Sequence, residues 1–457
     1  MKIIIIGAGP GGYETAIEAA GRGIEVVLVE KGNIGGTCLN EGCIPTKVLC
    51  RSAEAMEEMK KASSFGVQLP EDYVPRIDFS RVMQRKSEVV EQLRSGVGTL
   101  LSVKHITLVR GRAVLKDRHT VTVYTDDAGA CEYSGDRIII ASGSYPVPLG
   151  VPGGEYTLTS SDMLEIGTLP ESLCIIGAGV IGLEFASVFR SFGCRVTVLE
   201  YCRQILPRFD GDLAKRLKQS LSRRGIEIVT SASVQSVRKE GTGYAVSYLV
   251  KGALSEICAE KVLSAVGRRP AVEGIGLEQA GVEYGPKGIA VDDNMMTSVP
   301  GVYAIGDVTG RMMLAHVAVY QGLRALNHIC GKTDRIDFTV VPSAVFTDPE
   351  AASTGLTEEE CREQGIACRC FKSFFRANGK AVSMGQTDGF VKVVASDGGS
   401  GGRYRDGQML GCHLYGPHSS DLVAEISSLI ATGTTLDELS DIIHAHPTLS
   451  EVFRQLI

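Results

Sequence analysis

The sequence predicts an α/β fold with two Rossmann-like dinucleotide-binding domains, followed by a C-terminal α+β domain, and three observations support this prediction. Residues 3–30 run from a strand pattern through a Gly-x-Gly-x-x-Gly motif into a helix pattern and a second strand. Residues 173–200 repeat this order of elements around a second glycine motif. From about residue 334, the alternating stretch DFTVVPSAVFT and the helical stretch DLVAEISSLIATG indicate a different architecture.

Each repeat reads as an apolar strand, the glycine motif, an amphipathic helix, a glycine stop, another apolar strand and an acid. The glycines permit a tight turn and let the backbone approach a pyrophosphate at the N-terminus of the helix. The closing acid can accept hydrogen bonds from a ribose hydroxyl. We therefore predict two dinucleotide sites. Their matching residues are Gly7, Gly9, Gly12 and Glu30 in the first repeat, and Gly177, Gly179, Gly182 and Glu200 in the second, 170 residues further on.

The acid that ends the second repeat bears on the choice of nucleotide. Glu200 would repel a 2′-phosphate, which favours NAD over NADP. Arg203 follows three residues later, and its positive charge weakens this preference. We expect NAD at the second site.

Length and composition describe an ordinary globular chain. Its 457 residues correspond to roughly three domains of about 150 residues each. The chain is 44% hydrophobic and 22% charged, and its net charge of −6 gives no support for nucleic-acid binding. No apolar run approaches the ~20 residues that span a bilayer, and the opening MKIIII is too short for a signal-peptide core, so we expect a cytoplasmic protein.

Two of the 13 cysteines, Cys38 and Cys43, stand five residues apart in GGTCLNEGCIPTK (35–47). A zinc site needs about four ligands, and no second pair with suitable spacing is evident, so we predict no metal site. A purely structural disulfide is disfavoured in a reducing compartment. The third interpretation is a reversible redox disulfide. The helical pattern after Pro45 puts the pair at a helix N-terminus, which lowers a thiol pKa, and Gly42 allows the distorted turn that this spacing requires.

Short motifs spread over nearly the whole chain are similar to those of one enzyme family. They are GAGPGG (7–12), GGTCLNEGCIPTK (35–47), ASGS (141–144), GAGVIG (177–182), VGRRP (266–270), AIGDV (304–308), LAH (314–316) and HAHPTLSE (444–451). In this order they resemble the flavoprotein pyridine nucleotide-disulfide oxidoreductases. The resemblance is strongest to the branch that oxidises protein-bound dihydrolipoyl groups with FAD and NAD+.

The resemblance implies a role for each residue of the redox centre. Cys38 matches the thiol that exchanges with the substrate, and Cys43 matches the thiol that faces the flavin. Lys47 matches the lysine beside flavin N5, and Glu184 matches the carboxylate that pairs with this lysine.

The C-terminal motif is similar to the family's acid–base pair. His446 matches the catalytic imidazole, which titrates in the range useful for deprotonating a dithiol. Glu451 matches the carboxylate that orients this ring. Because His446 lies far from Cys38 along the chain, the family architecture implies that it reaches the disulfide of a second subunit in a homodimer.

The resemblance also assigns cofactor contacts. Asp307 matches the residue that binds the ribityl chain of the flavin, and the helix after it should point its N-terminus toward the flavin's pyrimidine end. The further residues expected to contact FAD are Gly7, Gly9, Gly12, Glu30, Thr37, Lys47, Ala113, Ser142, Gly143, Ala315 and His316. Those expected to contact NAD are Gly177, Gly179, Gly182, Glu200, Val234 and Gly267.

The motifs divide the chain into four regions: an FAD-binding domain (1–150), an NAD-binding domain (151–270), a central domain that completes the FAD site (271–333) and an interface domain for dimerisation (334–457). The implied partners are the lipoyl-bearing domains of a 2-oxo acid dehydrogenase complex or a glycine-cleavage system. The Gly-rich segment 397–407 is expected to be a hairpin connection without an assigned function. Glu41 replaces the family's apolar residue and places a carboxylate beside the thiols.

Two other functions share some of these features. A disulfide reductase of the glutathione type would carry most of the motifs, although such enzymes favour basic residues around the position of Glu200. A non-catalytic, flavin-bearing redox sensor would need the disulfide but neither His446 nor Glu451.

Overall fold

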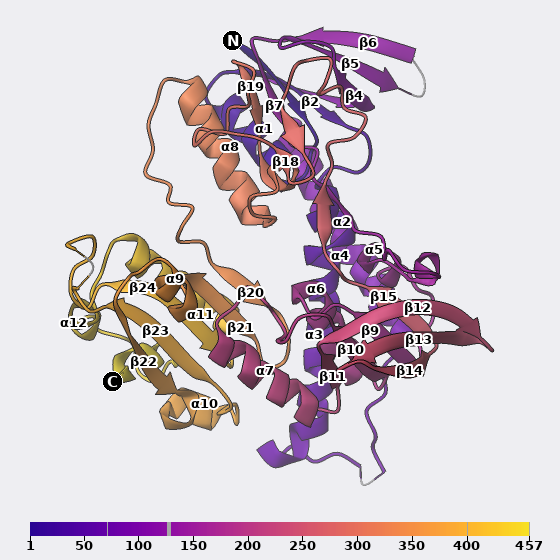
Figure 1. The fold of residues 1–457 in the computed structure, drawn as a ribbon, viewed down its shortest axis with the longest axis vertical. Coiled ribbons are helices and arrows are strands. Elements are labelled where there is room, and N and C mark those ends of the chain that lie inside the picture. Colours follow the sequence, from indigo (N-terminus) through magenta and orange to yellow (C-terminus); the bar gives the residue numbers. More distant parts are fainter. Residues whose placement is uncertain (71, 126–128, 400, 457) are drawn as a thin grey trace.

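The computed structural model describes residues 1–70, 72–125, 129–399 and 401–456. Three modules are visible in Figure 1, each built around its own β-sheet. The first module lies at the top of that view, the second at the lower right and the third at the lower left.

The first module contains a five-stranded parallel sheet in the order β19-β7-β1-β2-β3. Two helices from distant parts of the sequence, α1 and α8, pack against each other. A three-stranded antiparallel sheet, β4-β5-β6, follows β3 in the chain. The bounds are β1 (Lys2–Ile6), α1 (Pro10–Gly21), β2 (Glu25–Glu30), β3 (Ile106–Arg110), β4 (Arg112–Leu115), β5 (Thr120–Thr125), β6 (Gly129–Ser134), β7 (Arg137–Ile140), β19 (Val302–Ala304) and α8 (Ala315–Ile329).

Three helices, α2 (Gly36–Glu41), α3 (Cys43–Lys61) and α4 (Phe79–Leu101), run between β2 and β3 and lead from the first module toward the second (Figure 1). Asp78 caps α4 by accepting a hydrogen bond from the backbone N–H of Arg81 at 3.0 Å. Helix α3 packs against both α4 and α6 (Val180–Ser191) of the second module, so it forms the contact between these two parts.

The second module repeats the design of the first with the parallel sheet β11-β10-β9-β15. An antiparallel sheet, β12-β13-β14, lies between β11 and β15 in the sequence. The bounds are α5 (Ser160–Met163), β9 (Ser172–Ile176), β10 (Arg195–Glu200), α7 (Gly211–Arg223), β11 (Glu227–Thr230), β12 (Ala232–Glu240), β13 (Gly243–Val250), β14 (Ala253–Ala259) and β15 (Lys261–Ser264).

The chain enters and leaves the second module through two short strands that pair with each other. β8 (Ser144–Pro146) and β16 (Arg268–Pro270) run antiparallel in register, with Ser144 opposite Pro270. After β16 the chain forms the small pair β17 (Tyr284–Gly285) and β18 (Gly288–Ile289) and returns through β19 to the first sheet. The second module is therefore an insertion within the first.

The third module is a five-stranded antiparallel sheet, β20-β21-β24-β23-β22, with helices around it. The Gly-rich segment 397–407 joins the antiparallel neighbours β23 and β24, and its residue 400 lies outside the described residues. The bounds are β20 (Ser343–Val345), β21 (Ala351–Gly355), α9 (Glu358–Glu363), β22 (Cys368–Phe374), α10 (Gly379–Ser383), β23 (Phe390–Ser396), β24 (Met409–Tyr415), α11 (Ser419–Ala431) and α12 (Leu436–Ser440).

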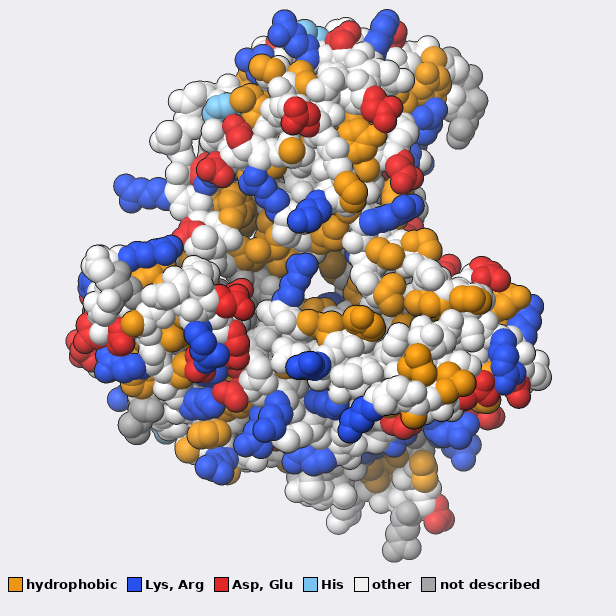
Figure 2. Space-filling view, in the orientation of Figure 1, with side chains coloured by type: hydrophobic (Ala, Val, Ile, Leu, Met, Phe, Trp, Pro, Cys, Tyr) orange, Lys and Arg blue, Asp and Glu red, His pale blue; other side chains and the backbone are white. Residues whose placement is uncertain are grey.

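The central strands are buried on both faces, as expected for parallel strands covered by helices. Ile3 to Ile6 of β1 are at most 5% exposed. One hydrophobic cluster includes Leu49 of α3, Phe189 of α6 and Tyr415 of β24, so α3 and the second and third modules share a core, whereas the first sheet packs into two clusters of its own. The surface is hollowed where the modules meet, and Lys and Arg side chains lie along part of the edge of this hollow (Figure 2). The predicted fold class is confirmed.

Candidate active site and dinucleotide-binding loops

The two glycine motifs have nearly the same backbone geometry. Gly7 and Gly177 adopt φ values of +102° and +106°, which L side chains rarely reach. A Cβ on Gly7 would lie 2.3 Å from the carbonyl oxygen of Ala141, and one on Gly177 would lie 2.4 Å from that of Ala265. Both positions therefore require glycine, because the turn passes directly against the end of a neighbouring strand.

The third glycine of each motif lets the helix pack onto its own turn. A Cβ on Gly12 would lie 1.8 Å from the carbonyl oxygen of Gly7, and one on Gly182 would lie 2.0 Å from that of Gly177. The middle glycines differ: a Cβ on Gly179 would have no neighbour within 4 Å. These loops thus leave backbone N–H groups open beside the N-termini of α1 and α6.

The acids that end the repeats also occupy equivalent positions. Glu30 accepts a hydrogen bond from the backbone N–H of Ala8 at 2.7 Å, and Glu200 accepts one from that of Ala178 at 2.6 Å. Each carboxylate therefore folds back onto its own glycine loop, at the end of the strand where a ribose would lie. The two copies of the repeat, which are 170 residues apart in the sequence, therefore match down to this hydrogen bond.

The two redox cysteines stand on two helices rather than one. Cys38 lies in α2 and is half-buried, whereas Cys43 is the first residue of α3 and is exposed. Gly42 separates the helices with φ −146° and ψ −107°. The distorted turn expected at Gly42 is thus a complete break, which brings the two thiols together in their reduced form.

The contact between the thiols makes them chemically unequal. A hydrogen bond from Cys38 lowers the pKa of Cys43 to about 7, and the charge of Lys47 assists this shift. The same contact raises the pKa of Cys38 far above that of an ordinary thiol. Cys43 is therefore the member of the pair that ionises near neutral pH.

Lys47 links the thiol helix to the second module. Its Nζ lies 2.9 Å from both carboxylate oxygens of Glu184 on α6. The Glu184 side chain is only 4% exposed, and burial would lower the pKa of Lys47, but Glu184 raises it above its ordinary value. Phe346 of the third module completes the arrangement: its N–H donates to Glu184 at 3.0 Å, and its ring lies 4.4 Å from the Lys47 ammonium.

A second polar cluster forms where β8 and β16 pair. Ser144 donates a hydrogen bond to Asp307, while Arg268 donates to the Ser144 hydroxyl and carbonyl, both at 2.8 Å. Burial lowers the pKa of Arg268, and the carboxylates of Asp307 and Glu41 oppose this shift. Glu41 also accepts a hydrogen bond from Ser161 at 3.3 Å. The Glu41 carboxylate, which follows Cys38 by three residues, thus has the Arg268 cation nearby and Ser161 as a hydrogen-bond donor.

The structure places the remaining expected FAD residues around the first sheet. Ala113 is buried in β4, and Ser142 donates to the carbonyl of Ala271 at 2.9 Å, just before Gly143 at φ +79°. Thr37 lies in α2 beside Cys38. Ala315 begins α8, and a ring nitrogen of His316 is 2.9 Å from the carbonyl oxygen of Pro342.

Besides the glycine loop and Glu200, two residues are expected to contact NAD, and both lie outside the second parallel sheet. Val234 is half-buried in β12. Gly267 precedes β16 with φ +122°, and its carbonyl accepts a hydrogen bond from Val147 at 2.9 Å.

The predicted acid–base pair is formed within the third module. Nδ1 of His446 lies 3.0 Å from Oε1 of Glu451, and Oε2 of the same carboxylate accepts a hydrogen bond from the N–H of Thr448. This backbone bond and the histidine lower the pKa of Glu451. The His446 side chain is 78% exposed. Its described hydrogen bonds within this chain go to Glu451 and none goes to either redox cysteine.

Three residues with clear roles in this geometry were not predicted from the sequence: Ser144, Arg268 and Phe346. Ser144 and Arg268 stand inside the motifs ASGS and VGRRP, so their motifs could have indicated them. Phe346 had no such signal, because its partners lie far away in the sequence. Among the described residues, no group of three or more His, Cys, Asp or Glu side chains could hold a metal ion.

Comparisons with known proteins match the whole chain. A family model for pyridine nucleotide-disulphide oxidoreductases matches residues 1–322, and one for the dimerisation domain of these enzymes matches residues 341–457. The chain is 39% identical over 455 residues to a dihydrolipoyl dehydrogenase from Geobacillus stearothermophilus, covering 99% of this chain and 94% of the relative. It is 40% identical over 457 residues to one from Chlamydia muridarum, covering 99% and 95%.

Solved structures give the same picture. The HOCl-induced flavoprotein disulfide reductase RclA from Escherichia coli matches with a TM-score of 0.86 at 30% identity, covering 100% of this chain and 99% of that one. No helix in the described part of the chain is long and apolar enough to cross a bilayer.

Proposed function

The chain belongs to the pyridine nucleotide-disulphide oxidoreductase family, and from that premise we propose how it acts as a dihydrolipoyl dehydrogenase through Cys38 and Cys43. It is an NAD-dependent flavoprotein oxidoreductase whose cofactors are FAD and NAD. Its dimerisation module makes it a homodimer.

The position of the thiol pair carries this proposal. Cys43 opens the helix that joins the two dinucleotide-binding modules, and Lys47 on the same helix is paired with Glu184 of the second module. A dithiol held between two nucleotide sites can pass two electrons from a substrate toward NAD+. This is the arrangement that oxidation of a dihydrolipoyl group requires.

The residues of the first module fit FAD. A Cβ on Gly36 would lie 2.6 Å from the Cα of Gly9, so this loop leaves room only for backbone beside a pyrophosphate. Glu30 ends β2 where a ribose would be bound. When bound, FAD supplies a two-electron acceptor for the dithiol and a two-electron donor for NAD+. The residues proposed to hold it are Gly7, Gly9, Gly12, Glu30, Thr37, Lys47, Ala113, Ser142, Gly143, Asp307, Ala315 and His316.

The second module presents the corresponding site for NAD, formed by Gly177, Gly179, Gly182, Glu200, Val234 and Gly267. Glu200 is 6% exposed, and its carboxylate accepts hydrogen bonds from the backbone N–H groups of Ala178 and Cys202. Such a fixed negative charge disfavours a 2′-phosphate, which supports NAD over NADP.

The two thiols divide the substrate chemistry between them. Cys43 is ionised near neutral pH, whereas the pKa of Cys38 is raised. A nearby acid–base group is therefore needed to take a proton from the attacking substrate thiol and to return one to Cys38 when it leaves as a thiolate. His446 is the proposed base, and Glu451 orients its ring through Nδ1, which leaves Nε2 available for proton transfer. Because His446 makes no described contact with Cys38 in its own chain, we propose that it serves the pair of the second subunit.

The substrate and its source follow from this chemistry. We propose that lipoyl-bearing domains of a 2-oxo acid dehydrogenase complex or a glycine-cleavage system deliver the dithiol. We also propose a cytoplasmic location, because the 13 cysteines are spread along 457 residues without the density of a disulfide-rich secreted scaffold. The four regions 1–150, 151–270, 271–333 and 334–457 remain our proposed domain division.

The purified holoenzyme tests this function directly. Dihydrolipoamide with NAD+ should give steady NADH formation, and exchange of NAD+ for NADP+ should lower kcat/KM sharply. Negligible activity with dihydrolipoamide, together with rapid NADPH-driven reduction of glutathione disulfide, would favour the glutathione-type alternative instead. A flavin-bearing protein that is inactive in both assays would favour the redox sensor.

A further inference from the structure

A second group of cysteines lies in the third module, away from the redox pair. Cys361 is on helix α9, and Cys368 and Cys370 are on the neighbouring strand β22. Only the short connection 364–367 separates the two elements. Nothing in the proposed dihydrolipoyl chemistry uses these thiols.

The packing of α9 on β22 brings two pairs of side chains into contact. Glu358 and Cys361 are three residues apart and share one face of α9, whereas Cys368 and Cys370 are two residues apart and share one face of β22. Because the chain reverses between the elements, Glu358 lies against Cys370, and Cys361 lies against Cys368. Cys361 and Cys368 also belong to one hydrophobic cluster with Ile366, Val394 and Leu410.

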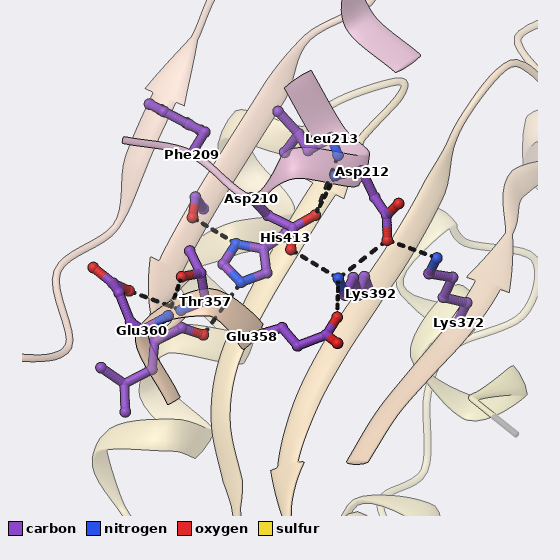
Figure 3. Close-up of polar contacts among 12 residues, drawn as sticks. Phe209, Asp210, Asp212, Leu213, Thr357, Glu358, Glu360, Lys372, Lys392 and His413 are labelled. Atoms are coloured by element: carbon purple, nitrogen blue, oxygen red, sulfur yellow. Dashed lines mark hydrogen bonds and ion pairs between the residues drawn. The ribbon is translucent and has the colours of Figure 1, made fainter. Parts of the chain in front are cut away.

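The surroundings of this group are fixed by a buried ion network (Figure 3). Lys392 on β23 is 2% exposed, and its ammonium lies 2.8 Å from Asp210 and 2.9 Å from Glu358. Asp210 in turn caps α7 of the second module by accepting the N–H of Asp212 and that of Leu213. Lys392 therefore links Glu358 of α9 to β23 and, through Asp210, to α7 of the second module.

We propose that Cys361 and Cys368 are a second oxidisable dithiol, a modification site that closes to an intramolecular disulfide when the protein meets a peroxide. The partly exposed Cys368 thiolate attacks the peroxide, which breaks the O–O bond, forms a sulfenic acid and releases hydroxide. Cys361 then attacks this sulfur, so that the S–S bond forms, the S–O bond breaks and water leaves. The two thiols lose two electrons, and one hydrogen peroxide becomes two waters.

Burial, together with the neighbouring groups, makes Cys361 and Cys370 poor initial nucleophiles. Burial raises the pKa of Cys361 to about 12, and contact with Cys368 adds to this shift, which suits a resolving thiol rather than the first nucleophile. Burial also raises the pKa of Cys370 to about 12; the charge of Lys392 opposes this shift and Glu358 adds to it. Cys370 is therefore the poorer initial nucleophile, although it is more exposed than Cys361.

The sequence allows the three thiols to be mapped one by one. Arg362, Arg369 and Lys372 put Cys361, Cys368 and Cys370 on three separate tryptic peptides, whereas Cys38 and Cys43 stay together on one. The reduced holoenzyme is treated with hydrogen peroxide, its free thiols are blocked with N-ethylmaleimide under denaturing conditions, and the digest is analysed by mass spectrometry. The Cys38–Cys43 peptide serves as an internal control for oxidation.

The expected result is a disulfide-linked pair of the Cys361 and Cys368 peptides, in a protein that remains folded and forms no disulfide between subunits. Cys370→Ser should retain this link, and Cys361→Ser should lose it. A Cys368–Cys370 or Cys361–Cys370 link would overturn the proposal. So would quantitative blocking of Cys361 by N-ethylmaleimide while the Cys38–Cys43 pair is oxidised. The wild-type map decides alone if Cys361→Ser fails to fold.

Discussion

Replacing Lys47 with Met tests how the redox pair acquires its reactive thiol. Lys47 stands four residues after Cys43 on α3, and residues four apart in a helix lie next to each other on the same face. Met keeps an unbranched chain but removes the charge that helps to lower the pKa of Cys43 to about 7. We expect this pKa to rise by about one unit, or ~1.4 kcal/mol, toward the ~8.5 of an ordinary thiol.

The change in pKa translates into a change in rate. A thiol with a pKa of about 7 is about half ionised at about pH 7, and one with a pKa of about 8 is about one-tenth ionised. Because only the thiolate reacts with iodoacetamide, alkylation of Cys43 in the reduced enzyme should slow about fivefold at that pH and converge with the wild type near about pH 10. As the pH falls, reactivity should be lost through about 7 in the wild type.

Two further variants control this experiment. Lys61→Met removes an exposed lysine from the end of the same helix and should leave the profile unchanged. The double variant Lys47→Met/Glu184→Gln also removes the buried carboxylate that the single variant leaves unpaired. Since Glu184 raises the pKa of Cys43, the double variant should show a smaller rise. An unchanged profile in Lys47→Met, or an equal shift in Lys61→Met, would refute the reasoning.

Three other predictions concern the acid–base pair and the nucleotide sites. His446→Gln should lower kcat with dihydrolipoamide by about 10²–10⁴-fold while flavin stays bound, whereas exposed His119→Gln should not; equal kcat values would remove His446 from the chemistry. Gly179→Ala should fold normally and raise the KM for NAD+, because its methyl group meets no protein atom, whereas Gly177→Ala should lower the melting temperature as well; indistinguishable variants would contradict the loop geometry. Arg268→Met removes the hydrogen bond that positions Ser144, which in turn donates to Asp307, so this variant should bind less flavin and show a lower flavin-to-protein absorbance ratio. Replacement of its exposed neighbour, Arg269→Met, should keep the wild-type ratio.

The repeated module was predictable because its information is local. A glycine that needs a positive φ, an apolar strand and a closing acid stand within 30 residues of one another, so the sequence of each repeat contains the whole pattern. The same holds for Glu451, which stands five residues from His446 and contacts it.

The rest of the site depends on distant contacts. Phe346 contacts Lys47 and Glu184 only because the third module packs onto α3 and α6, and no local pattern encodes this. The pairing of Lys47 with Glu184 was expected from the family resemblance alone. The break between α2 and α3 was only partly foreseen, because a helix of six residues beginning with Gly36 has no strong sequence signal.

The insertion of the second module sets an order for events during protein synthesis. Strand β7 keeps one bare edge until β19 emerges from the ribosome about 160 residues later, which takes ~10–30 s at ordinary elongation rates. The sheet of the second module is contiguous in the chain from residue 172 to 264, so it can close during this interval. The second module can therefore fold before the sheet of the first module is complete. Until β19 pairs with it, the unpaired edge of β7 is the place where a chaperone would protect the nascent chain from aggregation.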